Sequence, residues 1–262
     1  MTHRLLVLHF GAQCPWQPWI VDQARRAAEQ LGGTVRVADV TQQPDLAARY
    51  RLFFPSMTIV DGTICLPSPT LAEELVRIAA EGLAMAPATP TTWGSEARAE
   101  TVLPLTGDNI ADTCHLCIRP DELRGCGARA VWVVSMAHQV LDGILGFAAY
   151  HKGQAVGVVE FLPAPLVPYP LADRASDVAF IACLYSTQDG PDYRGQVLER
   201  LVRHLRGTGC CGLQVAAGQR TPYPNDSEAF FRQHGFEMVS EVDQVALREG
   251  EETLVLLRRA LP

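Results

Sequence analysis

The sequence predicts an α/β protein made of two units, each with a mixed sheet and flanking helices. At 262 residues the chain exceeds the usual domain size of about 100 to 150 residues. Apolar strands alternate with amphipathic helices on both sides of residues 85–100, a stretch rich in Pro, Thr and Ala that lacks hydrophobic periodicity. Such a composition is typical of a linker. We therefore expect domains at residues 1–84 and 101–262.

The first unit is predicted to run strand, helix, strand, helix, hairpin, helix. RLLVLHF (4–10) is a buried strand, and GAQCPWQPW leads into a helix that ends at Gly32-Gly33. TVRVADV is the second strand and PDLAARYR a short helix. SMTIVDGTICL forms a hairpin that turns at Asp61-Gly62. The last helix places four apolar side chains on one face: Leu71, Leu75, Ile78 and Ala79.

The second unit begins with a short strand, TVLPL, followed by a helix that opens at Thr106 and a helical region near residues 127–141. GFAAYHKG and QAVGVVEFL form a hairpin at Lys152-Gly153. Then come the strand VAFIACLYST, a polar loop, the amphipathic helix QVLERLVRHLR and the strand GLQVAAG. A short helix closing on HGF and two strands, EMVSEV and ETLVLLRRAL, complete the unit.

Composition narrows the classes of partner. The net charge of −7 argues against nucleic acid, which favours a basic surface. No run of about 20 apolar residues occurs, and the N-terminus does not resemble a signal peptide. We expect a cytoplasmic protein with small-molecule or protein partners and no membrane or nucleic-acid partner, and a homodimer stays an open alternative. The eight cysteines are predicted to be thiols.

Cys14 follows a strand and precedes a helix, whose positive end lowers the pKa of a thiol. Residues 14–17 (CPWQ), together with residues 54–56 (FPS) before a strand, resemble the thioredoxin fold, over roughly residues 3–84. In that family a cis-proline lies opposite the active-site cysteine, and Pro55 matches its position. Gln17 replaces the family's second cysteine, so a dithiol cycle within this motif is excluded. A reactive thiolate at Cys14 and an unreactive cysteine in a docking module are the alternatives.

Residues 101–261 resemble the GNAT acetyltransferases in the order and spacing of their motifs. YHKGQAVGVVEF looks like the hairpin before the cofactor strand, with Gly157 at the family's glycine position. VAFIACLYST looks like the strand that pairs with the pantetheine arm, DYRGQVLERLV like the pyrophosphate loop and its helix, and EAFFRQHGFEMV like the closing helix and strand. The resemblance implies acetyl-CoA as co-substrate and direct attack by an amine of a small molecule or peptide.

The expected cofactor contacts are mostly backbone. Unpaired N–H groups at a helix start favour an anion, and an exposed strand edge pairs with an amide-bearing arm. For the pyrophosphate we expect Arg194, Gly195 and Gln196, with the Arg194 guanidinium as an added cationic contact. For the pantetheine arm we expect Cys183, Leu184 and Tyr185.

Candidate acid and base residues follow from the same resemblance. Many GNAT enzymes have a tyrosine acid where this chain has Phe231, so Tyr185 and Tyr223 are the candidate acids. Glu160 is the best placed carboxylate for a base that deprotonates the amine. A solvated glutamate at a strand end is the alternative interpretation of Glu160.

Other features favour different functions. Gln196 and Leu198 stand where the family has glycines, and Asp189 and Asp192 add negative charge beside the anion site. Gln196 and Leu198, together with Phe231 and Gln17, favour a non-catalytic binding or regulatory protein that retains both folds.

A third alternative is a thiol- or metal-handling protein that uses Cys14 or the cluster of Cys114, Cys117 and Cys126. On a helix Cys114 and Cys117 share one face, where two thiolates could share an ion. We expect no metal, because small buried residues that line a helix-packing face are the preferred interpretation of the cluster.

Overall fold

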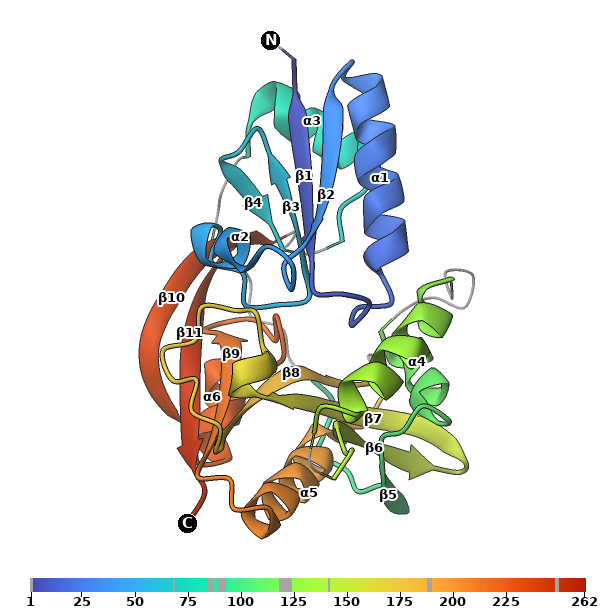
Figure 1. Ribbon diagram of the computed structural model, residues 1–262, viewed down its shortest axis with the longest axis vertical. Coiled ribbons are helices and arrows are strands. Elements are labelled where there is room, and N and C mark those ends of the chain that lie inside the picture. Colours follow the sequence, from blue (N-terminus) through green and yellow to red (C-terminus); the bar gives the residue numbers. More distant parts are fainter. Residues whose placement is uncertain are drawn as a thin grey trace.

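The computed structural model contains two mixed sheets, which lie one above the other in Figure 1. It describes residues 2–67, 69–83, 87–88, 93–117, 124–140, 142–187, 190–247 and 250–262. The predicted boundary at residues 84 and 85 lies outside them. None of the helices in these ranges is long and apolar enough to cross a membrane.

The first sheet has the strand order β2-β1-β3-β4, with β1 and β2 parallel and the other pairs antiparallel. Its strands are β1 (Arg4–His9), β2 (Thr34–Asp39), β3 (Ser56–Val60) and β4 (Ile64–Leu66). Its helices are α1 (Gln17–Gln30), α2 (Pro44–Arg49) and α3 (Ala72–Glu81). The predicted order of these elements is confirmed, including the hairpin at Asp61-Gly62, where both residues have positive φ.

The second sheet has the order β10-β11-β9-β8-β7-β6-β5 and is antiparallel except for the β8/β9 pair. Its strands are β5 (Thr101–Pro104), β6 (Gly146–His151), β7 (Gln154–Pro163), β8 (Val178–Ser186), β9 (Gly212–Gly218), β10 (Glu237–Leu247) and β11 (Gly250–Ala260). The helical elements are η1 (Ile110–Leu116), α4 (Arg124–Ala137), η3 (Ala164–Leu166), α5 (Arg194–Gly207) and α6 (Glu228–Gln233).

The two faces of the second sheet pack against different partners. Alternating side chains of β8 explain this: Ile181 joins the core under α5, whereas Phe180 points to the opposite face. We call the part of the chain that forms the first sheet and its helices the first half, and the rest the second half. On that opposite face the second sheet shares one core with the first half, and this core contains Leu8, Phe10 and Phe54 together with Phe180. In Figure 1 α5 accordingly lies on the side of the sheet away from the first half.

Close contacts join the two halves. The Phe10 ring lies edge-on to Trp132 and Tyr169 at centroid distances of 5.4 and 5.7 Å. Gly125 of α4 packs so closely on the loop after β1 that an added Cβ would lie 1.9 Å from the Pro15 carbonyl oxygen. The Arg51 guanidinium also donates to the carbonyl of Val242 in β10. The halves are therefore one packed body.

Three local predictions need correction. The Phe54–Pro55 peptide is not cis: the cis peptide among the described residues is Tyr223–Pro224. The helix expected to open at Thr106 is a 3-10 helix that starts at Ile110. The described end of the predicted linker, residues 93–99, is held by hydrogen bonds to the start of α5.

We predict that Phe10→Ala destabilises both halves together. Removing a fully buried aromatic ring costs about 3–5 kcal/mol of unfolding free energy, and the shared core transmits the loss to the second sheet. Urea unfolding followed by far-UV circular dichroism and by tryptophan fluorescence measures it. Leu71→Ala, at a side chain that is 51% exposed, is the control and should cost less than about 0.5 kcal/mol. Two separate transitions in the wild type would contradict the prediction.

Candidate functional site

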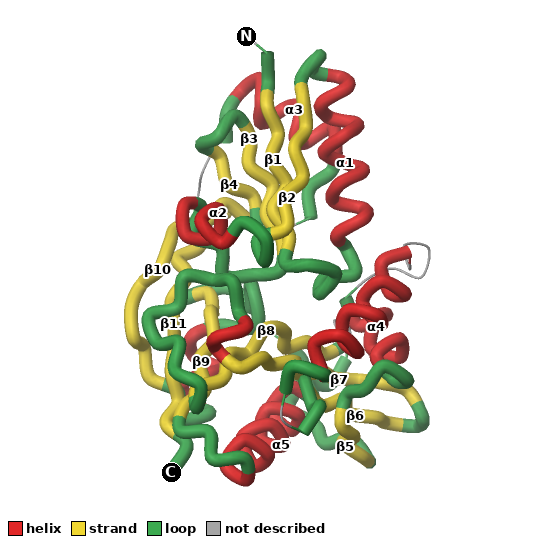
Figure 2. The backbone as a smooth tube through the Cα atoms, viewed as in Figure 1, coloured by secondary structure: helices red, strands yellow, loops and turns green. Residues whose placement is uncertain are grey.

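A cavity of about 460 Å³ lies between the two halves. Its walls come largely from loops that lie between the two sheets (green in Figure 2). The first half contributes Gln13, Cys14, Pro15, Trp16, Pro55, Ser56, Pro67 and Pro69. Trp93 and the second half contribute the rest: Cys117, Arg129, Cys183, Tyr185, Thr221, Pro222, Tyr223, Pro224 and Leu247. The cavity is thus rich in proline and aromatic rings and poor in charge.

The cavity opens where two parallel strands diverge. β8 pairs with β9 only along Val178–Ile181, opposite Gly212–Val215. Beyond that point the β8 edge faces the first half, and the Gln13 side-chain amide donates to the Ala182 carbonyl at 3.2 Å. Cys183 and Tyr185 reach the cavity wall, whereas Leu184 packs into the core under α5. The edge predicted to pair with a pantetheine arm therefore borders the cavity, and Gln13 already occupies one carbonyl there.

Three free thiols line this cavity: Cys14, Cys117 and Cys183. Burial raises the pKa of Cys14, and hydrogen bonds from the backbone of Trp16 and Gln17 only partly offset it. Burial also raises the pKa of Cys117, to about 12, and that of Cys183. The prediction that the helix start lowers the pKa of Cys14 is wrong, because the thiol sits in the packed junction between the halves rather than at an exposed helix end.

Glu160 is buried and forms an ion pair with the equally buried Arg129. The interpretation of Glu160 as a solvated strand-end residue is therefore wrong. Its carboxylate is held by the guanidinium, which also donates to the Thr113 hydroxyl at 3.2 Å. Arg129 rather than Glu160 borders the cavity. Sequence reasoning missed Arg129, although one arginine within the apolar run of α4 was a usable signal of a buried partner.

The two tyrosines predicted as acids both border the cavity. The Tyr223 hydroxyl donates to the Pro67 carbonyl at 2.8 Å, and the Tyr185 hydroxyl donates to the Pro224 carbonyl at 3.3 Å. Burial raises the pKa of both phenols well above the usual value, so both stay protonated. Phe231, where the family has its acid, is fully buried and packs on Phe230 and Phe236.

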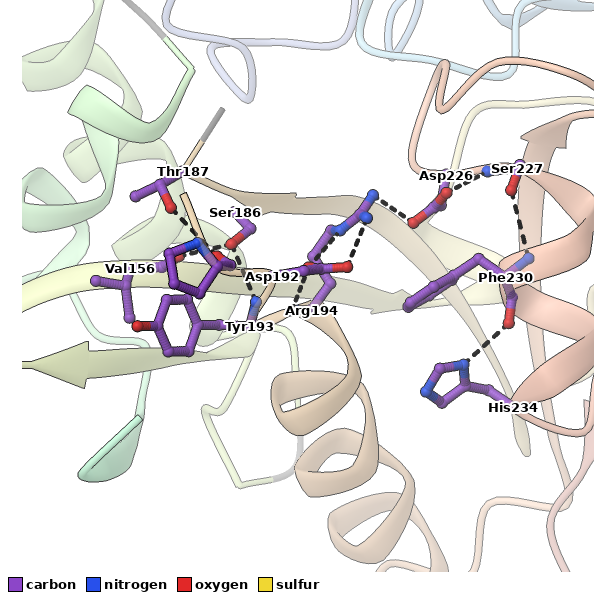
Figure 3. Close-up of polar contacts among 11 residues, drawn as sticks. Val156, Ser186, Thr187, Asp192, Tyr193, Arg194, Asp226, Ser227, Phe230 and His234 are labelled. Carbon is purple, nitrogen blue, oxygen red and sulfur yellow. Dashed lines mark hydrogen bonds and ion pairs between the residues drawn. The ribbon is translucent and has the colours of Figure 1, made fainter. Parts of the chain in front are cut away.

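The start of α5 is occupied by an internal ion-pair network (Figure 3). Arg194 is 1% exposed and donates through Nε and Nη2 to the Asp192 carboxylate at 2.8 and 2.7 Å. It also pairs with Asp226, and its guanidinium carbon lies 3.8 Å from the Trp93 ring centre. The Arg194 backbone N–H donates to Asp192 as well. Carboxylates of the chain thus engage both the guanidinium and the backbone N–H of Arg194, which were expected to contact a phosphate. The phosphate contact itself stays a prediction.

Residues 93–99, which we call the 93–99 segment, cover the same helix start. Asp192 exchanges backbone hydrogen bonds with Ser95 and Ala97 at 2.9 and 2.8 Å. The Gln196 side chain exchanges two further hydrogen bonds with the Ala99 backbone.

The predicted cofactor residue Gly195 also faces this segment. A Cβ added there would lie 3.1 Å from a Glu96 carboxylate oxygen and 3.2 Å from the His234 ring. Three carboxylates, those of Glu96, Asp192 and Asp226, thus surround the predicted phosphate site. Asp189 of the same loop lies outside the described residues.

The cysteine cluster of residues 114–126 contains a disulfide between Cys114 and Cys126. The prediction that all eight cysteines are thiols is wrong for this pair. Cys117 is free and turns to the cavity, so Cys114 and Cys117 do not form a shared ion site. In the described ranges, no group of three or more His, Cys, Asp or Glu side chains is arranged to hold a metal ion.

Comparison with known proteins yields structural similarities only. No family model matches the chain, and no curated protein matches it. The ribosomal-protein-alanine N-acetyltransferase from Brucella melitensis is similar over 62% of this chain and 99% of its own, with 18% identity and a TM-score of 0.45. The GphF GNAT-like decarboxylase in complex with isobutyryl-CoA matches 62% of this chain and all of its own, with 15% identity and a TM-score of 0.44.

A third similar structure is the PaiA N-acetyltransferase from Thermoplasma acidophilum in complex with coenzyme A. It covers 61% of this chain and 98% of its own, with 9% identity and a TM-score of 0.42. At such identities and TM-scores the similarity does not carry a function to this chain, which must be argued from its own site.

We predict that Arg194→Ala is strongly destabilising. The substitution leaves two buried carboxylates without their cation, which costs about 3–5 kcal/mol of unfolding free energy. Arg232→Ala is the matched control, because Arg232 pairs with Glu228 on the exposed face of α6 and such pairs contribute less than about 1 kcal/mol. Denaturant unfolding of both variants measures the difference. Equal losses in the two would contradict a buried network at Arg194.

We also predict a pH-dependent contribution from Asp226. Burial raises the pKa of its carboxyl from 3.8 to about 6, against the opposing effect of Arg194. The folded state therefore holds this proton more tightly than the unfolded state. The resulting stabilisation is complete below about pH 4 and is lost as the pH rises through about 6.

The measurement is the unfolding free energy of wild type minus that of Asp226→Asn. This difference should fall by up to about 2–3 kcal/mol between pH 4 and pH 7 and stay level above that range. Asp45→Asn, at an exposed position, is the control. A difference that does not change with pH would contradict the assignment.

Proposed function

We propose that this chain is a binding protein whose ligand occupies the cavity between a thioredoxin-like first half and a GNAT-like second half. The observation that carries the proposal is the covered start of α5. Arg194 is neutralised by Asp192 and Asp226, and the 93–99 segment lies over the helix end. A cofactor pyrophosphate at this place would meet buried carboxylates instead of free N–H groups.

The cavity wall indicates what kind of ligand fits. Arg129 is the charged side chain among the lining residues, which are mostly prolines, aromatic residues and thiols. The Gln13 side chain beside the β8 edge and the hydroxyls of Tyr185 and Tyr223 are polar groups of the same lining residues. Such a lining suits a small, largely uncharged molecule with amide or carbonyl groups.

A second candidate function is acetyl transfer from acetyl-CoA to an amine of a small molecule or peptide. The divergence of β8 from β9 favours it, because it leaves a strand edge at Cys183 and Tyr185 on the cavity wall. Under this candidate Glu160 would act as base and Tyr185 or Tyr223 as acid. Both Gln13 and the 93–99 segment would have to move before the cofactor could reach that edge.

Calorimetry with acetyl-CoA and with free CoA separates the two candidates. Under the binding-protein proposal no saturable heat appears up to about 1 mM ligand, the concentration range of a very weak site. Trp93→Ala should not restore binding, because Asp192 and Asp226 still hold Arg194. Saturable binding of acetyl-CoA to the wild type would reject the first candidate and support the second.

The ligand class is tested with ligand-observed NMR on a set of small amides and carbonyl compounds. We predict that fragments which bind the wild type lose about five- to tenfold in affinity in Gln13→Leu, because one hydrogen bond is worth about 1 kcal/mol. Gln42→Leu, at an exposed position away from the cavity, should bind them unchanged. The absence of any fragment sensitive to Gln13 would contradict the proposal.

A further inference from the structure

A disulfide joins two elements that both reach the cavity. Cys114 belongs to η1 and Cys126 to the first turn of α4, and their sulfurs are bonded. Cys117, which directly follows η1, lines the cavity, and so does Arg129, which lies three residues after Cys126 in α4. The bond therefore fixes one wall element to the other.

The remaining cysteines of the chain indicate how this bond is used. Six of the eight cysteines are free thiols: Cys14, Cys65, Cys117, Cys183, Cys210 and Cys211. A chain with mostly free thiols is typical of reducing surroundings, where the few disulfides that form are usually transient. Cys126 is half-buried, whereas Cys114 is 1% exposed. An incoming thiol therefore reaches the Cys126 sulfur first.

The start of α4 has little stability of its own. Cys126 stands between two glycines, and glycine destabilises a helix more than any residue except proline. Gly125 has a packing role, because an added Cβ would lie 1.9 Å from the Pro15 carbonyl oxygen. Gly127 has no such role among the described residues, since an added Cβ would meet none of them within 4 Å. The disulfide thus holds a helix start that its own sequence weakens.

The two ends of the disulfide hold the same loop of the first half. On the α4 side Gly125 packs on Pro15, which lines the cavity next to Cys14. On the η1 side the Trp16 indole N–H donates to the Cys117 carbonyl at 2.6 Å. Breaking the disulfide therefore removes a covalent restraint from both contacts of this cavity-wall loop.

We propose that the Cys114–Cys126 disulfide is a reversible redox switch. Reduction by a low-molecular-weight thiol of the glutathione class frees the first turn of α4 and loosens the cavity wall at the loop of Cys14. Oxidation restores the closed wall. The inference goes beyond the proposed function, because it concerns the wall of the cavity whatever ligand the cavity binds.

The switch reaction is a thiol–disulfide exchange that consumes two thiols. A thiolate of the reductant attacks the Cys126 sulfur, the S–S bond breaks, and Cys114 leaves as a thiolate that takes a proton from the solvent. A second reductant thiolate attacks the mixed disulfide and releases Cys126, which is protonated in turn. The protein gains two electrons and two protons, and the two reductant thiols become one disulfide. The reverse exchange with that disulfide closes the switch.

A redox titration tests whether the bond is reversible in the folded protein. The full chain is equilibrated in buffers of reduced and oxidised glutathione, then alkylated and mapped by peptide mass spectrometry. We expect Cys114 and Cys126 to pass together from disulfide to dithiol within the range of ratios that these buffers span. A bond that persists at the most reducing ratio would make it a structural disulfide and overturn the proposal. A disulfide from either residue to Cys117 would overturn it too.

Hydrogen exchange tests whether reduction opens the helix start. The amides of residues 128–131 donate to the carbonyls of the first turn of α4, so their exchange reports its opening. We expect reduction to lower their protection by at least about tenfold, because the loss of a disulfide restraint typically favours the open state by more than this factor. The amides of α5, which contains no cysteine, should not change. Unchanged protection in α4, or an equal loss in both helices, would contradict a local switch.

Gly127→Ala tests the role of the weak helix start. We expect the protection of the same amides in the reduced protein to rise about fivefold, because alanine stabilises a helix interior relative to glycine. Gly207→Ala is the matched control, since Gly207 ends α5 and an added Cβ there also meets no described residue within 4 Å. The control should leave α4 unchanged. An equal rise in both variants would indicate global unfolding and overturn the switch.

Alkylation of Cys14 tests the link to the cavity wall. In Cys126→Ser, which cannot form the bond, Cys14 should react with iodoacetamide at least about tenfold faster than in the oxidised wild type. Cys65, which lies outside the cavity lining, should react at the same rate in both proteins. An unchanged rate at Cys14 would overturn the link. None of these readouts needs a ligand, so failure of fragment binding would reject the proposed function alone, and unchanged exchange and alkylation would reject this inference alone.

Discussion

The buried guanidinium of Arg194 is the interaction on which the arrangement of the second half depends. It joins three separate segments: the start of α5, the loop before α6 through Asp226, and the 93–99 segment through Trp93. An arginine with no exposure is tolerated only where opposite charge and hydrogen bonds replace its hydration. Because carboxylates of the chain pair with the Arg194 guanidinium, they fix how these segments meet. The same pairing neutralises the positive charge that an anionic cofactor would need.

The second buried ion pair, between Arg129 and Glu160, also joins separate segments of the chain. It anchors α4 to β7 and brings a cation to the wall of the cavity. The charge of Arg129 is thus already paired within the chain, and the rest of the cavity surface is left mostly to prolines, aromatic rings and thiols. Such a surface suits uncharged ligands better than phosphates.

Secondary structure was predictable where a local pattern was strong. Apolar runs identified β8 and β9, and Asp61-Gly62 identified the hairpin of β3 and β4. Expectations that depended on distant contacts failed. Cys14 is at a helix start, as predicted, but burial against the second half reverses the expected direction of its pKa shift. Arg194 has the right place for a phosphate ligand, yet Asp226, 32 positions later, takes its guanidinium.

The sequence by itself determined the order of helices and strands and the faces on which their apolar residues lie. These properties depend on neighbouring residues and on hydrophobic periodicity, which are visible in one chain. Only the tertiary structure decided which charges pair, which thiols share a cavity and where the 93–99 segment lies. Those outcomes depend on contacts between residues far apart in the sequence, and burial sets their strength, so no local pattern can encode them.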